Sequence, residues 1–427
     1  MNPFESISPF LFYAYLPYYQ PERASKLLPG LDLEQDIPDN TIANMNESDV
    51  TEYGIQLLKS TISSILDKNK TGYHIVPLSG GLDSRGILAS LIDAGLREQI
   101  IAVTFGIPGS WNYELGSGLA KIFNVKHKGL DLDHFELSTE RLLDSAREGC
   151  SWTFLIDGYY NSLIPKEYGQ NIVYWSGYMG GALAGFDRFR VLSKKNGHWE
   201  DAKKLFAQRR GHLRATIDMS SPDFDPVQTL PVDPISNNRN IGYMDQLWLF
   251  IHNLNYLKRV VVFDEYNYQT PYCSPEWVKF MLSLSDEYRF NKYLYKKILK
   301  RAYPDFFSYP ISKLRGGSLN SSRPEILLRR ILHKTSKNIA VSNPIWNRIG
   351  IYRDVNYIDF DRAIRERDDY KKVVYENISD LKVRKLIDWF DPEKIWKDHI
   401  NKKADLGIAL VLLTALEISL KSEELSL

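Results

Sequence analysis

The residues of this sequence best suited to chemistry lie in one loop, Leu78-Ser-Gly-Gly-Leu-Asp-Ser-Arg85, between an apolar stretch and an amphipathic one. Its two glycines let the backbone turn tightly and approach a ligand closely. Its successive N–H groups, together with the start of a following helix, would face an anion. Its serine hydroxyls add donors, and its aspartate can hold the magnesium that accompanies a polyphosphate. The loop therefore predicts a phosphate site, with a plain tight turn and helix cap as the simpler alternative.

The candidate ligands come from the whole of this loop. Arg85 is either a phosphate ligand or a charge on the helix surface, and the surface position is slightly favoured. The loop does not end in the GK[ST] of the Walker type, which usually marks chemistry at the γ-phosphate. The candidate phosphate ligands are Leu78, Ser79, Gly80, Gly81, Asp83, Ser84 and Arg85, and Asp83 is also the candidate metal ligand.

A phosphate loop of this kind needs a strand before it and a helix after it, and the flanking pattern supplies both. Short apolar runs alternate with segments of helical periodicity, the first of which starts at a possible Asp49 cap. This alternation predicts an α/β fold, with a parallel sheet covered by helices. The expected strands are 74–79, 100–105, 127–132 and 171–176, and the expected helices include 49–68, 84–95 and 114–123.

The end of the second expected strand supplies further candidates. In open parallel sheets, ligands bind beyond the carboxyl ends of the strands. Thr104, Phe105 and Gly106 stand at such an end and would border an adenine ring. Phe105 fits the hydrophobic core equally well.

The chain changes character twice, which divides it into three segments. Residues 1–48 are aromatic, punctuated by proline and expected to be irregular. Residues 49–202 carry the alternating pattern and are expected to form a nucleotide-binding α/β core. Residues 203–427 begin with loop-like sequence and become almost entirely helical in pattern from Tyr243 onward.

Composition excludes several other classes of protein. Lys and Arg number 54 against 53 Asp and Glu, and this balance provides no overall field for nucleic acid or an anionic membrane. The start of the chain lacks a secretory signal, and the apolar run Gly407–Leu416 is shorter than a bilayer span. Only Cys150 and Cys273 occur, and no histidines have zinc-ligand spacing, so a reducing cytoplasmic location is expected.

The SGGLDS core of the loop resembles the pyrophosphate-binding loop of the PP-loop ATP pyrophosphatases, a superfamily that includes asparagine synthetase, GMP synthetase, NAD synthetase and tRNA-thiolating enzymes. The resemblance implies attack on the α-phosphorus of ATP, with AMP carried on the substrate and pyrophosphate left in the loop. Sulfur transfer to tRNA would require a thiolate near the loop and a basic surface, and the sequence favours neither.

Later segments are similar to the asparagine synthetase branch, from about Asp49 to the end of the chain. The stretch Ser176–Gly185 resembles that branch's SGxGxDExxGG motif, which adds Ser176 and Gly177 as candidate ATP ligands. Residues 269–289 resemble its RxPFLD segment, and residues 290–318 resemble the region that places Lys313 on the family's catalytic lysine. A fixed ammonium there would stabilise the negative charge that develops in adenylation and in the later tetrahedral intermediate.

The chain departs from the family in three places. No early cysteine is present, and residues 8–30 resemble the tail of the family's glutaminase domain, so we expect no glutamine hydrolysis by this chain. Gly181 and Ala182 stand where the family has an Asp-Glu pair, which leaves Asp83 as the one matched metal ligand; Asp187 is a possible substitute. In the related β-lactam synthetases a glutamate assists deprotonation, and Asn267 occupies that place here.

The expected function is therefore that of an ATP- and Mg²⁺-dependent ligase that forms an amide bond through an acyl-adenylate. The partners would be a small-molecule or peptide carboxylate and either ammonia or an amine, with closure within one molecule or between two. β-Lactam synthetases and lasso-peptide cyclases are related enzymes that close an amide within one molecule. A catalytically silent nucleotide-binding homologue is one alternative, and a synthetase subunit fed by a separate partner protein is the other.

Overall fold

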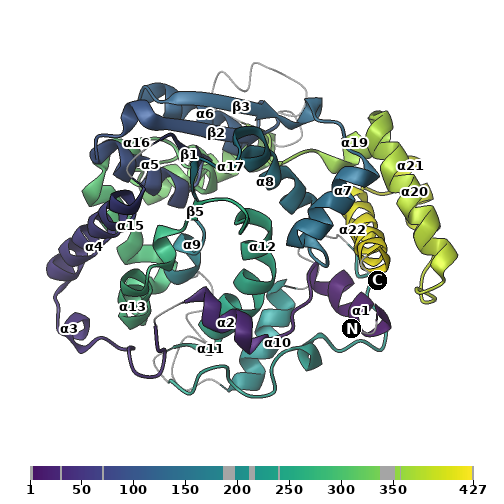
Figure 1. Ribbon diagram of the computed structural model, residues 1–427, viewed down its shortest axis with the longest axis horizontal. Coiled ribbons are helices and arrows are strands. Elements are labelled where there is room, and N and C mark those ends of the chain that lie inside the picture. The colour runs from purple at the N-terminus through teal and green to yellow at the C-terminus, as the bar shows by residue number, and fades with distance from the viewer. Residues whose placement is uncertain are drawn as a thin grey trace.

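The computed structural model describes residues 3–28, 31–69, 72–185, 198–210, 217–238, 241–336, 352–355 and 357–425. It confirms the α/β class: five strands form one all-parallel sheet in the order β3-β2-β1-β4-β5 (Figure 1). The four strands expected from the apolar runs are all present. The strands are β1 (His74–Pro77), β2 (Ile100–Gly106), β3 (Lys126–Asp131), β4 (Val173–Trp175) and β5 (Tyr268–Gln269).

The central strands are apolar because helices cover both of their faces. Six of the seven residues of β2 are buried, as are three of the four in β1, so these strands appear in the sequence as continuous apolar runs. The edge strand β5 is only two residues long, too short for any periodicity, and was not predicted. The helices in this part of the chain are α4 (Glu47–Lys68), α5 (Asp83–Asp93), α6 (Trp111–Ile122), α7 (Thr139–Ser145) and α8 (Leu155–Tyr168).

The helix α4 has a different cap from the one expected. Its N-cap is Asn46, whose side-chain oxygen accepts hydrogen bonds from the backbone N–H groups of Ser48 and Asp49 at 2.9 and 3.0 Å. Asp49 lies in the first turn, where its negative charge favours the helix dipole instead.

The C-terminal half is helical, as its pattern predicts. One element is unusual: η5 (Trp248–Leu257) is a π-helix, a form that occurs often at functional sites. The helix α10 runs across the boundary expected at residues 202 and 203. The other helices are α9 (Gly180–Leu183), α11 (Tyr243–Leu247), α12 (Lys258–Val261), α13 (Pro275–Ser283), α14 (Asp286–Arg289), α15 (Tyr293–Ala302), α16 (Pro304–Ser308), α17 (Arg323–Ser336), α19 (Phe360–Glu366), α20 (Asp368–Arg384), α21 (Pro392–Ile400) and α22 (Gly407–Glu424).

The N-terminal segment is not irregular, and that expectation was wrong. It contains α1 (Pro3–Tyr13), α2 (Pro21–Leu27) and α3 (Asn40–Ala43), and α1 packs against α22 near the C-terminus (Figure 1). Phe10 is fully buried and meets Trp152 edge to face, with ring centroids 5.7 Å apart. The segment's aromatic residues therefore belong to the main core, where each buries a large apolar area.

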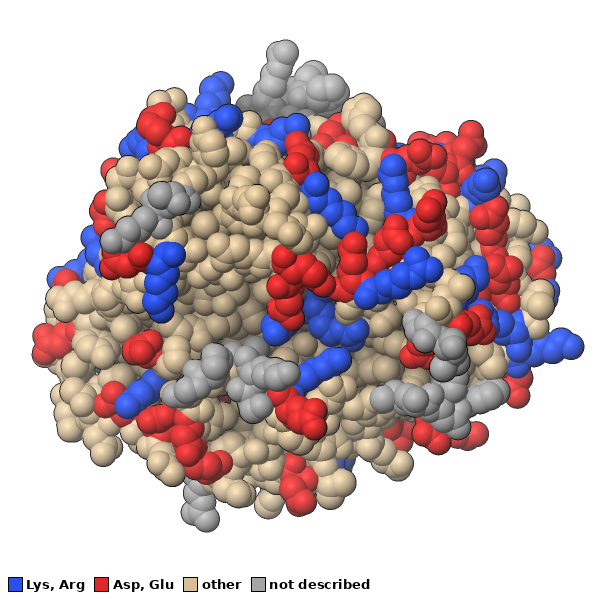
Figure 2. Space-filling view, in the orientation of Figure 1, with Lys and Arg blue, Asp and Glu red and all other residues tan. Residues whose placement is uncertain are grey.

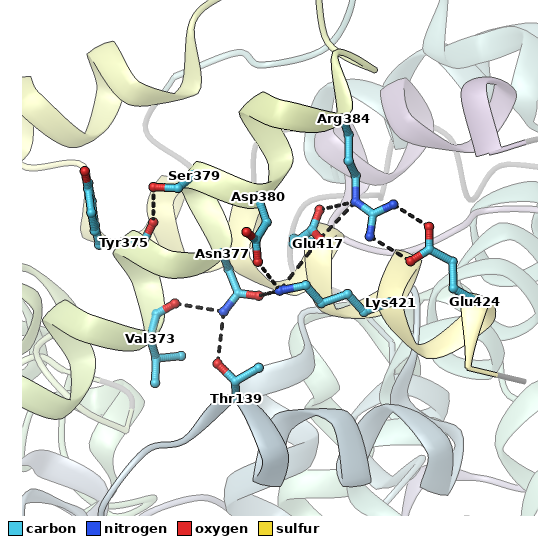
Figure 3. Close-up of polar contacts among 10 residues, drawn as sticks. All are labelled: Thr139, Val373, Tyr375, Asn377, Ser379, Asp380, Arg384, Glu417, Lys421 and Glu424. Carbon is cyan, nitrogen blue, oxygen red and sulfur yellow. Dashed lines mark hydrogen bonds and ion pairs between the residues drawn. The ribbon is translucent and has the colours of Figure 1, made fainter.

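The last helix is apolar on nearly every face because other helices surround it. Its one fully buried charge, Glu417, accepts two hydrogen bonds from Arg384 Nε on α20, at 2.9 and 2.7 Å (Figure 3). Arg384 also binds Glu424, and Lys421 binds Asp380 at 2.6 Å, so charged pairs link the two helices along their length. No helix in the described part of the chain is both long and apolar enough to cross a membrane.

We expect the Arg384→Met substitution to lower the free energy of unfolding by about 2–4 kcal/mol, because it leaves the buried Glu417 carboxylate with a weaker partner, Lys421, at 3.7 Å. Urea unfolding followed by circular dichroism would measure the change. Glu424→Gln is the matched control and should cost less than about 1 kcal/mol, because Glu424 is 59% exposed. Equal losses in both variants would show that Glu417 does not depend on Arg384.

Candidate functional site

A cavity of about 440 Å³ opens at the carboxyl ends of β1, β2 and β4. Segments far apart in the sequence meet there: the loop after β1, the end of β2, the stretch after β4, the π-helix η5 and the chain around residue 313. Nine of the thirteen candidate residues line it, and the four others do not. The nine are Leu78, Ser79, Gly81, Asp83, Ser84, Phe105, Ser176, Gly177 and Lys313, and the four are Gly80, Arg85, Thr104 and Gly106.

The loop after β1 is held in shape by its own serines. The backbone N–H of Gly81 donates to Ser79 Oγ at 3.2 Å, and the N–H of Ser79 donates to Ser84 Oγ at 3.3 Å. Helix α5 begins directly afterwards, and within the described chain no side chain caps its first N–H groups. These groups therefore remain available to an anion at the start of the helix.

Two buried tyrosines hold Asp83 in place, one through its carboxylate and one through its backbone carbonyl. Tyr295 donates to Asp83 Oδ1 at 2.8 Å, and Tyr272 donates to the backbone oxygen of Asp83 at 3.1 Å. Burial, reinforced by the nearby Asp83 carboxylate, raises the pKa of both phenols above the ordinary value. They stay protonated at physiological pH and act as hydrogen-bond donors. Neither of them donates to Asp83 Oδ2.

Glycines let the stretch after β4 approach Asp83 closely. A Cβ atom at Gly177 would lie 2.9 Å from Asp83 Cβ, and one at Gly180 would lie 2.9 Å from Asp83 Oδ1. Either side chain would force the two segments apart, because real Cβ contacts are longer than this. The SGxxGG pattern of Ser176–Gly181 therefore has a steric reason in this structure: it brings the end of β4 against the loop after β1.

Lys292 is a cavity residue that the sequence reasoning missed. Its Nζ lies 2.5 Å from the position that a Cβ atom at Gly181 would occupy, and Asp83 Oδ2 lies 3.2 Å from the same position. It was missed because its direction depends on two consecutive left-handed residues, Asn291 (φ 60°) and Lys292 (φ 57°), between α14 and α15. If residues 290–302 formed one continuous helix, the side chain of Lys292 would point in a different direction. The Phe-Asn pair before Lys292 is the only local sign in the sequence that the helix begins after it.

Lys313 reaches the cavity from a tight turn that is bonded to the phosphate loop. It lies in the short 3₁₀ helix η8 (Ser312–Leu314), and the N–H of Ser312 donates to the carbonyl of Gly80 at 3.1 Å. Gly80 itself packs so closely on Ser312 that a Cβ atom would lie 3.0 Å from Ser312 Cβ. Gly80 is thus a spacer that permits this contact rather than a residue of the cavity wall.

Arg85 is neither on the surface nor in the cavity, so the favoured surface position was wrong. Its side chain is fully buried and donates to the carbonyls of Phe306, Tyr309 and Pro310 at 3.2, 2.9 and 2.6 Å. Burial lowers its pKa to about 10, so the guanidinium remains charged near neutral pH. Arg85 therefore ties the first turn of α5 to the chain that leads into Lys313.

Replacing Arg85 with methionine should lower the free energy of unfolding by about 3 kcal/mol, since three carbonyl groups would lose their donor. Chemical unfolding monitored by tryptophan fluorescence would measure it. Arg301→Met is the matched control; Arg301 forms an ion pair with Glu52 that is half exposed, and we expect a loss below about 1 kcal/mol. A stable Arg85→Met protein would mean that the segment before Lys313 is held by other contacts.

The three candidates at the end of β2 divide between the cavity and the core. Phe105 lines the cavity and stacks on Tyr357, with ring centroids 5.4 Å apart and an interplanar angle of 10°. The hydroxyl of Thr104 donates to the carbonyl of Leu78 at 3.0 Å, which braces the start of the loop from behind. Gly106 adopts a φ of 139°, a conformation that favours glycine and turns the chain away from the sheet.

The remaining candidates lie elsewhere. Asn267 donates to Asn69 Oδ1 at 3.1 Å on the exposed side of β5 and is not part of the cavity wall. Asp187 falls outside the described residues. Burial raises the pKa of Cys150 and Cys273 to about 12, so neither thiol is a thiolate at physiological pH.

The donor set fits one magnesium ion bound together with a nucleotide. Among the described residues, no three His, Cys, Asp or Glu side chains come together as a metal site. Mg²⁺ bound with polyphosphates usually takes one or two protein carboxylates and completes its octahedron with phosphate oxygens and water. Asp83 could supply one such carboxylate, next to the unblocked N–H groups at the start of α5.

No protein-family model matches the chain, and no curated protein sequence matches it. The chemistry that the cavity can support is set by the side chains that line it. In the described wall the charged residues are Asp83, Lys292 and Lys313, all beside the phosphate loop. On the face shown in Figure 2, by contrast, the described basic and acidic side chains are interspersed rather than gathered by sign.

Proposed function

We propose that this protein is a ligase of the PP-loop type that cleaves ATP to AMP and pyrophosphate while it forms an amide bond. The observation that carries the proposal is that two candidates far apart in the sequence meet in one cavity. Lys313 lies more than two hundred residues after the SGGLDS loop, yet both line one cavity, and Ser312 is hydrogen-bonded to Gly80 of the loop. A loop for pyrophosphate and an ammonium for the reacting centre are the two parts that the reaction requires.

ATP would lie across the carboxyl ends of the strands. The stacked pair of Phe105 and Tyr357 offers a flat aromatic surface for the adenine ring, and the amides of Asn112 and Asn161 also line this part of the cavity. The β- and γ-phosphates would occupy the loop, where backbone N–H groups and the start of α5 favour negative charge. Asp83 would hold the magnesium ion, which neutralises the leaving pyrophosphate.

The reaction then proceeds in two displacements. A carboxylate oxygen of the substrate attacks the α-phosphorus, and the bond from that phosphorus to the bridging oxygen of pyrophosphate breaks. Ammonia or an amine next attacks the acyl carbon, loses a proton, and expels AMP as the carbon–oxygen bond breaks. Lys313 is the residue placed to stabilise the negative charge that develops in both steps.

The cavity wall away from the loop indicates the kind of carboxylate. The stretch after β4 and the helices η5 and α12 contribute apolar and aromatic side chains there, including Met179, Ala182, Leu257 and Val261. The hydroxyl of Tyr178 donates to the carbonyl of Asn253 at 3.1 Å and fixes η5 against this stretch. Such a wall favours an acid with an uncharged, apolar body over a small, doubly charged amino acid.

A catalytically silent nucleotide-binding homologue is the second candidate, and Gly181 is the observation that favours it. The family's aspartate is missing at this position, so the site could have lost its metal chemistry. A protein without catalytic function would no longer need close packing around Asp83. The glycines and the two tyrosine hydrogen bonds are nevertheless all in place. A synthetase subunit that receives its amine from a separate partner protein is compatible with the same cavity.

The products of nucleotide cleavage test the proposal directly. Protein incubated with Mg-ATP, ammonium and a mixture of small apolar carboxylic acids should release AMP and pyrophosphate in equal amounts, measured by liquid chromatography. Asp83→Ala should lower the rate at least one-hundredfold, because it removes the only carboxylate in the described wall. ADP and phosphate as the products would exclude attack at the α-phosphorus.

Lys313→Met should separate catalysis from binding. Loss of a charge that acts mainly on the transition state lowers kcat by about 10²–10³ and leaves ATP affinity within a few fold. Pre-steady-state product formation and isothermal titration with a non-hydrolysable ATP analogue would measure the two quantities. A variant with normal turnover would remove Lys313 from the reaction.

A further inference from the structure

We infer that the ammonium of Lys292 replaces a second metal-binding carboxylate, so that pyrophosphate is held in this cavity by a single Mg²⁺ ion and Lys292. The inference rests on the proposed function and specifies how its site binds the leaving group. It starts from the geometry at Gly181, where an aspartate would complete a two-carboxylate site.

The position of residue 181 is directed at Asp83. A Cβ atom there would lie 3.2 Å from Asp83 Oδ2, so an aspartate would place its carboxylate next to that of Asp83. Two adjacent carboxylates repel each other and require a cation between them. In this chain the same Cβ position lies 2.5 Å from Lys292 Nζ, which means that the ammonium already fills the space that a side chain at 181 would need.

The placement of Lys292 is built into the fold. Two left-handed residues, Asn291 and Lys292, turn the chain at the start of α15, and Tyr295 follows one helical turn later. Tyr295 donates to Asp83 Oδ1 from the first turn of α15, and Lys292, which lies just before that turn, directs its ammonium to the cavity wall beside Gly181. One turn of chain therefore brings both a hydrogen-bond donor and a positive charge to Asp83.

The charges of the described wall agree with this role. Asp83, Lys292 and Lys313 together carry a net charge of +1 before any metal binds. A site with two carboxylates and Lys313, but without Lys292, would need two Mg²⁺ ions to reach the net charge that this site reaches with one. An ammonium gives the positive charge permanently and cannot dissociate, so the requirement for free Mg²⁺ falls.

Binding of pyrophosphate, measured by isothermal titration calorimetry at increasing Mg²⁺, tests the inference without catalysis. The wild-type affinity should reach its maximum near one Mg²⁺ per pyrophosphate. Lys292→Met should weaken binding at least tenfold, whereas Lys292→Arg should stay within about threefold. Lys300→Met, on the exposed face of the same helix, should bind as the wild type does.

A double variant, Gly181→Asp with Lys292→Met, should regain affinity only when Mg²⁺ exceeds pyrophosphate, because it restores the two-carboxylate arrangement. Thermal melting of each variant checks that it is folded. Wild-type affinity that keeps rising beyond one equivalent of Mg²⁺, or normal binding by folded Lys292→Met, would overturn the role of Lys292 alone. Absence of pyrophosphate binding by the wild type at any Mg²⁺ concentration would overturn the proposed function as well.

Discussion

The buried guanidinium of Arg85 is the constraint on which the candidate site depends. A charge without exposed surface is tolerated only where polar groups surround it, and Arg85 meets three carbonyls and the faces of two aromatic rings, Phe307 and Tyr309. Its partners lie more than two hundred residues away along the chain. The loop after β1 and the segment that carries Lys313 are therefore held against each other by the protein's own contacts.

A second constraint is the crowding around Asp83. The stretch after β4 packs against this residue through glycines, and α15 reaches it through the hydroxyl of Tyr295. The loop that carries Asp83 and these two segments thus meet at one carboxylate, and a side chain at Gly177 or Gly180 would force them apart. Because the elements are close-packed, a change at any of the three would be felt by the others. Gly181 and the inward turn of Lys292 are best understood together, because the Lys292 ammonium occupies the space that a side chain at 181 would need.

Far from the cavity, the fold is closed by contacts between the two ends of the chain. The helix α1 packs on α22, and Trp152 links the two. Its ring contacts Phe10, and its backbone N–H donates to Ser419 Oγ at 2.8 Å. The ion pairs of Arg384 and Lys421 hold α20 to the other side of α22 (Figure 3). This frame leaves the carboxyl edge of the sheet open to a ligand while the opposite parts of the molecule are packed.

The sequence predicts four of the five strands, the loop after β1 and nine of the residues that line the cavity. These follow from local rules: continuous apolar runs mark buried strands, glycines mark close approach, and parallel strands bring their carboxyl ends to one edge. Only the tertiary structure decided where Arg85 and Lys292 point, and that the aromatic N-terminal segment forms helices in the core. The first depends on distant carbonyls and the second on two left-handed residues. The third depends on a surface supplied by α22 at the other end of the chain. Such features are set by long-range packing, which overrides local propensity.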